Sequence, residues 1–309
     1  MFLDNIIIAA RQVGILYIMV LIGIICDKIG WFTEKTGKAC TDLLFYIITP
    51  SVIINSFLTR EFTKDSGIKL LIAVGCGFIL HLIAIAINTP LFSRGDSDEN
   101  CVYKYGAIYG NVGYMTLPLT EAILGSEGVF YCSAVVMAFN VVSFTHGVFM
   151  MDKAKGFDAK KLILNPGVIA VLIGLPFFIL KISLPELITK PVDFIANTQT
   201  PIAMIVFGTF LSHTTLKSIL KHKKIFLVAL SKLIILPAIM FGVYRLIGLS
   251  GTLLVAMTIS ACAPSANNTV LFSAKYGKDT GLASQLVATV SFISIITMPI
   301  IIAAVQTIA

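Results

Sequence analysis

The stretch that decides the fold reads Tyr109-Gly110-Asn111-Val112-Gly113-Tyr114-Met115-Thr116-Leu117-Pro118, and a second stretch, Ala263-Pro264-Ser265-Ala266-Asn267-Asn268, matches it in the other half of the chain. Each interrupts an apolar run with proline and asparagine, and the first also carries two glycines. Inside a bilayer, a backbone N–H or C=O freed by such a break is costly unless protein, water or a ligand satisfies it. Paired breaks at corresponding places in two halves are typical of a transporter's binding site. We therefore expect a polar cavity at the breaks.

Composition places the chain in a membrane. Of its 309 residues, 57% are hydrophobic and 13% are charged, against about 25% charged residues in an average soluble domain. Apolar runs of about 20 residues, enough to cross a hydrocarbon core of about 30 Å, can be placed repeatedly along it. The runs lie near residues 6–26, 39–58, 68–92, 101–124, 128–151, 163–180, 191–212, 225–247, 251–274 and 281–305. We predict an all-α membrane protein with ten transmembrane helices, of which the fourth and ninth are broken.

The basic residues set the predicted orientation. Fifteen of the 23 lysines and arginines fall in one alternate set of loops, at residues 27–38, 93–104, 152–161, 213–224 and 275–278. By the positive-inside rule this set is cytoplasmic, so both termini lie outside the cytoplasmic (inner) membrane. The first segment lacks a basic leader and a small-residue cleavage site, so we interpret it as a retained span. The net charge of +7 therefore serves topology beside anionic lipid headgroups, not nucleic-acid binding.

Catalytic and metal-binding motifs are missing from the sequence. The six cysteines are scattered through or beside apolar segments, with no CxxC pair and no histidine at ligand spacing, so we interpret them as packing residues. The chain has no nucleophile elbow, HExxH motif, P-loop or pair of acids within one span. We expect neither an enzyme nor ATP-driven transport, and neither a metal nor a cofactor. Secondary transport or passive facilitation remains.

Landmarks in the two halves repeat at a nearly constant offset. Thr49-Pro50 and Thr200-Pro201 lie 151 residues apart, and the two broken stretches have nearly the same separation. The spacer at 125–128 likewise matches the spacer at 277–281. These landmarks predict two five-helix repeats, residues 1–151 and 163–309, joined by a short cytoplasmic linker at 152–162. Because five is odd, the second repeat is inverted, and the broken segments cross near the membrane midplane.

The predicted crossing suits an anion. Half-helix N-termini would point positive dipole ends and free N–H groups toward it, where they would hold a carboxylate. Asparagine side chains carry both donors and acceptors, so they could bind a carboxylate without a permanent charge in lipid. The candidates are Asn111, Asn267 and Asn268. The alternative for each is a purely structural cap of its half-helix.

Other residues of the breaks complete the candidate site. Pro118 and Pro264 each remove an N–H and clash with the preceding turn, which accounts for the breaks. Gly113 lets backbone or ligand approach closely. The remaining candidates in these stretches are Tyr114, Thr116 and Ser265.

Two Thr-Pro pairs flank the predicted crossing. Thr49 with Pro50, and Thr200 with Pro201, would kink their helices if the repeat is real. Hydroxyls beside transmembrane prolines commonly satisfy freed backbone groups. A role in lining the cavity is the other interpretation, and the sequence leaves both open.

Three ionisable residues within the predicted spans are candidates for coupling or for tuning charge. Lys232 is the most costly, since a central charge in a span is penalised by roughly 2.5 to 3.5 kcal/mol on translocon scales. It is a substrate counter-ion, a fixed positive charge where a relative holds sodium, or a side chain that snorkels to the cytoplasmic edge. His81 and His146 could relay protons near neutral pH. Their alternative is a hydrogen-bonded core histidine.

At the two broken stretches the chain resembles the auxin efflux carrier family, which includes bacterial permeases for malate and other carboxylates and the plant PIN-FORMED auxin exporters. The resemblance runs over essentially the whole chain. It implies two inverted five-helix repeats, divided into a scaffold and a crossover-containing transport domain that move relative to each other, and dimers through the scaffold. The residues that carry it are 109–113, 117–119, 200–208, 263–268, 275–279, 283–284 and 297–299.

The resemblance assigns some residues and leaves others in doubt. The family's crossover asparagine and proline correspond to Asn111 and Pro118, and to Pro264 with either Asn267 or Asn268. The central loop lacks the length of the plant exporters' hydrophilic loop, which implies a prokaryotic permease. Relatives in the sodium and bile-acid symporter group carry a sodium-binding glutamate near the second break, whereas this chain has no acid between residues 245 and 279. Proton coupling or uniport is therefore favoured over sodium coupling.

These observations predict a multi-pass secondary transporter that moves a small organic anion, a mono- or dicarboxylate such as malate, by alternating access. One alternative is a sodium-coupled symporter of a larger amphipathic anion of the bile-acid or auxin kind. Another, of a different class, is a transporter-like sensor that signals through a partner at the basic loops. Counterflow in vesicles separates the sensor from the transporters, because a sensor binds its ligand without exchanging it.

Overall fold

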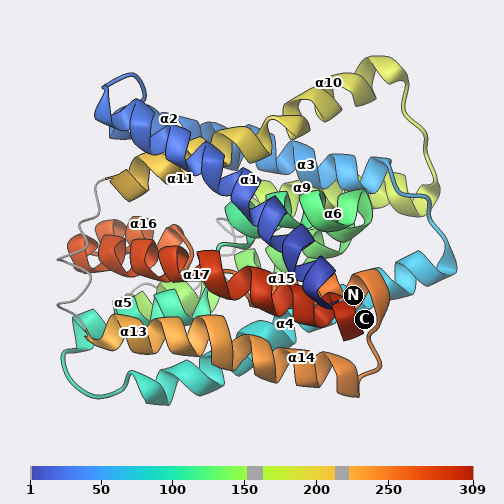
Figure 1. Ribbon diagram of the computed structural model, residues 1–309. Helices are drawn as coiled ribbons and strands as arrows, with labels where there is room; N and C mark the ends of the chain where they lie inside the picture. The colour runs from blue at the N-terminus through green and yellow to red at the C-terminus, as the bar shows by residue number, and fades with distance from the viewer. Residues whose placement is uncertain (1, 152–162, 213–222, 309) are drawn as a thin grey trace.

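The computed structural model describes residues 2–151, 163–212 and 223–308, and within them the chain is built of helices (Figure 1). The predicted linker at 152–162 lies outside the described residues. Helical stretches long and apolar enough to cross a membrane are Lys35–Leu58, Lys64–Leu91, Val112–Met151, Glu186–Ser212, Lys223–Leu246 and Thr280–Ile308. Two shorter apolar helices, Pro166–Leu180 and Gly251–Ala261, accompany these six. An all-α membrane protein is therefore what the chain forms.

The first half of the chain contains helical segments interrupted by π turns. They are α1 (Phe2–Lys28), α2 (Glu34–Leu43), η1 (Leu44–Ile48), α3 (Thr49–Leu58), α4 (Lys64–Leu91), α5 (Ser97–Ile108), η2 (Val112–Thr116), α6 (Leu117–Val142), η3 (Ser143–Gly147) and α7 (Val148–Met151). Within α6 the backbone leaves helical geometry at Gly125, with φ 64° and ψ −160°. Only glycine adopts such angles easily. The kink falls where the sequence places the boundary between the fourth and fifth spans.

The second half has the same character. Its described elements are α9 (Pro166–Leu180), α10 (Glu186–Asn197), α11 (Gln199–Ser212), α13 (Lys223–Leu230), η4 (Ser231–Ile235), α14 (Leu236–Leu246), α15 (Gly251–Ala261), α16 (Asn268–Lys275) and α17 (Thr280–Ile308). Between α15 and α16 the chain leaves helical structure over the second stretch that the sequence marks as broken. The first stretch is broken between α5 and η2.

Prolines explain three of the π turns. η1, η2 and η4 each end one residue before an X-Pro pair, at Pro50, Pro118 and Pro237. In each, the N–H of the residue before proline bonds the carbonyl five residues back, for example Leu117 to Val112. A proline ring clashes with the carbonyl four residues before it, so the turn widens. The kink predicted at Pro50 is therefore a π turn.

The helices form two groups. α1 packs along α11, and α3 packs against α9 and α10; in Figure 1, α2, α3, α10 and α11 occupy the upper part of the view. α4 and α15 pack against α6, and α16 packs against α17; α4, α5, α13 and α14 lie in the lower part of the view. The groups meet where α1 contacts α17 and α3 contacts α6.

Glycines set the closest helix contact in the first group. A Cβ added at Gly23 of α1 would overlap the carbonyl oxygen of Ile205, and one added at Gly208 of α11 would overlap that of Val20. Small residues let helix backbones approach in this way within membranes, where dispersion contacts drive association. This contact joins the first predicted span to the seventh.

Candidate functional site

The two broken stretches lie directly against each other. The N–H of Asn111 donates to the carbonyl of Pro264 at 2.7 Å, and the N–H of Ala266 donates to the carbonyl of Tyr109 at 2.9 Å. Gly110 and Ser265 thus form an isolated antiparallel bridge. Backbone groups freed by one break are satisfied by the other, which removes much of the cost of unwinding a buried helix. The crossing of the two predicted breaks is therefore a physical contact.

A hydrogen bond and close packing with neighbouring segments fix the position of this bridge. The hydroxyl of Ser265, which is fully buried, donates to the carbonyl of Gly106 at 2.7 Å. A Cβ at Gly110 would lie 2.9 Å from the Cβ of Ala263 and 3.2 Å from the Nζ of Lys232. Ser265 therefore links the second break to α5 by a hydrogen bond. Gly110 has no room for a side chain, because Ala263 and Lys232 lie against it.

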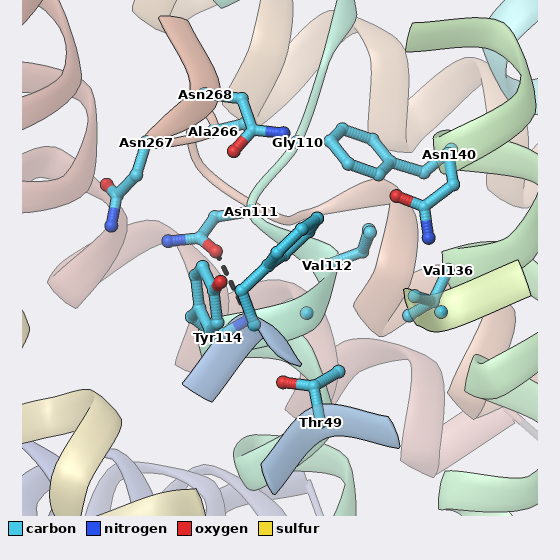
Figure 2. Close-up of a pocket in the computed structure, with 14 residues that line it drawn as sticks. Thr49, Gly110, Asn111, Val112, Tyr114, Val136, Asn140, Ala266, Asn267 and Asn268 are labelled. Atoms are coloured by element: carbon cyan, nitrogen blue, oxygen red, sulfur yellow. Dashed lines mark hydrogen bonds between the residues drawn. The ribbon is translucent and has the colours of Figure 1, made fainter. Parts of the chain in front are cut away.

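A cavity of about 40 Å³ opens beside the bridge. Figure 2 shows the side chains of Asn111, Asn267 and Asn268 on one side of it, Asn140 and Val136 on another, and Thr49 reaching in from α3. Each water needs roughly 10 to 15 Å³ by this measure, so the cavity holds about three. Its lining residues are Phe45, Thr49, Gly110, Asn111, Val112, Gly113, Tyr114, Val136, Phe139, Asn140, Gly167, Ala266, Asn267 and Asn268.

Amide groups dominate the polar lining. The Oδ1 of Asn111 accepts the N–H of Tyr114 at 3.2 Å, so this side chain does cap its half-helix. The side chain of Asn268 contacts the Tyr105 hydroxyl, while among the described residues that of Asn267 has no hydrogen-bond partner. Asn111 keeps its Nδ2 group for another partner, since one amide offers donors as well as an acceptor. The cap and a ligand contact are therefore compatible at Asn111.

Two functional candidates were missed from the sequence. Asn140, buried on α6, lines the cavity opposite the crossing. Gln199, the first residue of α11, donates from Nε2 to the carbonyl of Gly113 at 2.8 Å, while its Oε1 has no partner among the described residues. The signal available was an amide within a predicted span, alone among apolar residues at Asn140 and beside Asn197 and two threonines at Gln199. Its facing direction could not be read, because spans are apolar all round.

The Thr-Pro pairs differ in position. Thr49 lines the cavity, and its buried hydroxyl has no hydrogen-bond partner in the part of the chain that the structure describes. Thr200 instead lies near the carboxylate of Glu121, and Pro201 is exposed at the surface. Of the remaining candidates, Gly113 and Tyr114 line the cavity. Those outside its lining are Pro50, Thr116, Pro118, Pro264 and Ser265, which shape or fasten the breaks.

Lys232 lies inside the protein, next to the crossing. Only 1% of the residue is exposed, and its Nζ donates to the carbonyl of Ile108 at 3.1 Å. No acidic side chain of the described residues pairs with it. The π turn η4 carries Lys232 to the buried side together with Ser231, whose hydroxyl donates to Asn88 at 2.6 Å. Burying an unpaired ammonium is costly, so the snorkelling alternative does not hold and a compensating anion would be favoured nearby.

The two histidines have different surroundings. His81 of α4 is buried, and its Nδ1 lies 2.7 Å from the carbonyl of Gly77. That contact matches the core-histidine interpretation. His146 of η3 is half-buried, and its Nδ1 lies 2.9 Å from the hydroxyl of Tyr109. Both rings pack near Tyr109, with centroid distances of 5.9 Å for His81 and 6.4 Å for His146.

Within the described residues, no group of three or more histidine, cysteine or acidic side chains could hold a metal ion. The cavity lining contains no ionised side chain. The arrangement can therefore accept hydrogen bonds and donate them to a small polar molecule, with the buried amine of Lys232 behind the Gly110 backbone.

The chain is similar in sequence to known membrane transport proteins. The sequence model of a family described as "Membrane transport protein" matches residues 8–159 and 154–302. A protein of Rhizobium meliloti named "Putative malonate transporter" is 22% identical over 88% of this chain and 85% of its own length. An uncharacterized transporter of Methanocaldococcus jannaschii is 25% identical over 90% of this chain and 93% of its own length. One from Methanothermobacter thermautotrophicus is 23% identical over 92% and 94%.

Proposed function

We propose that this chain, which belongs to the membrane transport protein family, is a secondary transporter that moves a small organic anion across the cytoplasmic membrane by alternating access. Membership confirms the resemblance to auxin efflux carriers and the expectation that the chain is not an enzyme. The observation that carries the proposal is the contact between two broken segments beside a polar cavity. Substrate, coupling and mechanism are the parts that go beyond the family.

The proposed architecture is two inverted five-helix repeats, residues 1–151 and 163–309, with ten spans and both termini outside. The antiparallel bridge between Gly110 and Ser265 supports it, since inverted repeats bring equivalent breaks together in opposite directions. The kink at Gly125 supports the count, because it divides the long stretch Val112–Met151 where two spans are expected. A reporter fused at each loop would test the orientation.

The two helix groups are the proposed scaffold and transport domain. α1, α3, α9 and α11 would form the scaffold, and dimers would form through it. α4, α5, α6 and α13 to α17 would carry the crossing. Gln199 of α11 bonds Gly113 at the crossing, and this bond is one of several polar contacts between the groups, with Tyr17 to Ser291 and Ser56 to Ser133, that sliding would break and reform. Alternating access would then follow from movement of the crossing past the scaffold.

The proposed substrate is a small carboxylate, and a dicarboxylate of the malonate or malate kind is the first choice. Asn111, Asn267 and Asn268 would donate hydrogen bonds to it. Lys232 would attract it from behind Gly110, since a buried cation acts strongly through low dielectric. The name of the Rhizobium meliloti relative supports malonate. A cavity that holds about three waters favours a small anion over a bile acid, and the substrate would widen it on entry.

Counterflow of radiolabelled dicarboxylate in proteoliposomes tests the proposal. Wild type should exchange malonate or malate, whereas a ligand sensor would bind without exchange. Asn111→Ala together with Asn268→Ala should abolish exchange, because both amides line the cavity. Asn197→Ala is the matched control, since Asn197 is exposed at the end of α10 and should leave exchange intact.

Absence of exchange for every small carboxylate would overturn the proposed substrate class. Exchange of a larger amphipathic anion that requires sodium would establish the alternative symporter. The sequence opposes it, because no acid lies between residues 245 and 279. Equal exchange by the double variant and Asn197→Ala would move the substrate site away from the crossing.

A further inference from the structure

A π turn in the fifth predicted span forms hydrogen bonds with two tyrosines of the fourth predicted span. The hydroxyl of Tyr105 lies 2.6 Å from the Oγ of Ser143, and the hydroxyl of Tyr109 lies 2.9 Å from the Nδ1 of His146. Both partners belong to η3 (Ser143–Gly147). A Cβ on Gly147 would lie 2.9 Å from the Tyr105 ring and 3.2 Å from the Tyr109 ring. Gly147 therefore allows both rings to pack against this turn.

The same tyrosines reach both broken stretches. The backbone carbonyl of Tyr109 accepts the N–H of Ala266, one of the bonds that form the crossing. The Tyr105 hydroxyl also contacts the side chain of Asn268, which lines the cavity. A change in the hydrogen bonds at η3 can therefore affect the first break through Tyr109 and the second break through Tyr105.

We propose that His146, bonded to Tyr109, is the proton-binding site that couples a proton to movement of the substrate. The inference rests on the proposed function and names its coupling ion. In the neutral state the Nδ1 of His146 accepts the O–H of Tyr109. When the imidazole takes one proton from a hydronium ion, which becomes water, Nδ1–H donates to the Tyr109 oxygen, and the tyrosine hydrogen turns to the Val142 carbonyl at 3.2 Å. No other bond forms or breaks.

His146 suits this role better than the other histidine in the cluster. A coupling site must exchange its proton with water, and His146 is half-buried whereas only 2% of His81 is exposed. The Nδ1 of His81 is already bonded to the Gly77 carbonyl at 2.7 Å. The Tyr109 ring packs near both imidazoles, but of the two histidines only His146 bonds the Tyr109 hydroxyl.

The charged and titratable groups around His146 come from neighbouring helices. α5 contributes Lys104, Tyr105 and Tyr109. α4 contributes His81 across the Tyr109 ring, and α16 contributes an apolar contact between Phe272 and Phe144. None of the described carboxylates pairs with His146. A substrate carboxylate arriving at the crossing would therefore be the anion that favours the protonated imidazole, which is the linkage that symport requires.

The test separates coupling from exchange in one proteoliposome preparation. With the membrane potential clamped at zero, a gradient of about one pH unit should drive about tenfold accumulation of dicarboxylate in wild type at one proton per substrate. His146→Gln keeps an amide that can bond Tyr109 but does not titrate. It should retain counterflow and lose the gradient-driven accumulation. Tyr109→Phe, which removes the partner hydroxyl, should weaken accumulation more than counterflow.

His81→Gln is the matched control, and it should keep both activities. Gradient-driven accumulation by His146→Gln equal to wild type would overturn the coupling site while leaving the transporter proposal intact. The same holds if wild type exchanges substrate but never accumulates it, since the protein is then a uniporter. Absence of counterflow for wild type with every carboxylate would remove the proposed function itself.

Discussion

Two pairs of helical segments bring their backbones into contact in this molecule, and the contacts differ in kind. α1 and α11 stay helical where Gly23 and Gly208 meet, so their backbone groups remain bonded within each helix. At Gly110 and Ser265 both segments have lost helical structure, and their backbone groups bond across the contact. The first contact contributes packing, whereas the second leaves amides and a cavity beside it. In this molecule, glycines in intact helices form a packed interface between α1 and α11. Glycine together with proline and asparagine forms the candidate binding site at the crossing.

The two contacts should therefore respond to different changes. A larger side chain at the helix interface should lower the free energy of unfolding. It should not change ligand binding directly, because no ligand is expected there. A change of polarity or charge should damage the crossing through transport while stability changes little. Variants of matched chemistry at the two places can break or sharpen this distinction.

The largest effect on stability is expected from Gly208→Ala. Its methyl group would overlap the carbonyl oxygen of Val20, and because that atom is backbone, α1 and α11 must separate. We expect the free energy of unfolding to fall by about 3 kcal/mol, the upper end for overpacking. Thermal unfolding in detergent measures it. Gly75→Ala on α4 is the control, since a Cβ there meets nothing within 4 Å; equal melting temperatures for both variants would contradict the proposed interface.

Gly110→Ala should reduce transport strongly and stability only slightly, the opposite of Gly208→Ala. Its methyl would press on Ala263 and on the Nζ of Lys232, which is a flexible side-chain end. We expect about 1 kcal/mol of destabilisation. Counterflow should fall about tenfold, the equivalent of 1.4 kcal/mol of binding. Gly75→Ala is the control, since its Cβ meets open space and Gly75 lies outside the cavity lining; if it impairs counterflow equally, the contact at Gly110 is not what matters.

Lys232→Met removes the buried charge behind the crossing. Loss of the ammonium removes a desolvation penalty, while the Ile108 carbonyl loses its donor, so stability should change by less than about 2 kcal/mol. Counterflow should fall strongly, because the anion loses its nearby cation. Lys232→Gln can still donate to Ile108, so it separates the hydrogen bond from the charge. Normal counterflow in the glutamine variant would show that charge is dispensable.

The smallest effect is expected at two buried hydroxyls. Thr49 and Thr116 each bury a hydroxyl that has no hydrogen-bond partner within the described residues, but only Thr49 lines the cavity. Replacing either with valine should stabilise the protein by about 1 kcal/mol, because an unsatisfied buried polar group is removed. Only Thr49→Val should also raise the KM for substrate, by about threefold for one lost neutral hydrogen bond. Transport kinetics with equal KM values would place the substrate away from Thr49.

Local signals made the breaks predictable. Proline at Pro118 removes an N–H and forces a wide turn, and that chemistry depends only on the residues within one turn. Asn111 acts within the same stretch, as a cap, for the same reason. The pairing of the two breaks was also predictable, because the offset between halves is visible along the chain.

Facing direction was not predictable. Asn140 and Gln199 lie in apolar helices whose periodicity gives no preferred side, so their contacts emerged only when distant helices packed together. Lys232 had three possible fates in the sequence. The π turn before Pro237 and the packing of α13 and α14 excluded snorkelling by turning the side chain toward Ile108.

By itself the sequence determined the membrane class, the positions of the breaks and the presence of asparagines within them. These depend on composition and on backbone chemistry between near neighbours. The tertiary structure alone decided that Thr49 faces the cavity while Thr200 lies near Glu121, and that His146 reaches Tyr109 while His81 bonds its own helix. The physical reason is that a side chain's partners are set by helices far away in the sequence, whose relative rotation no local pattern records.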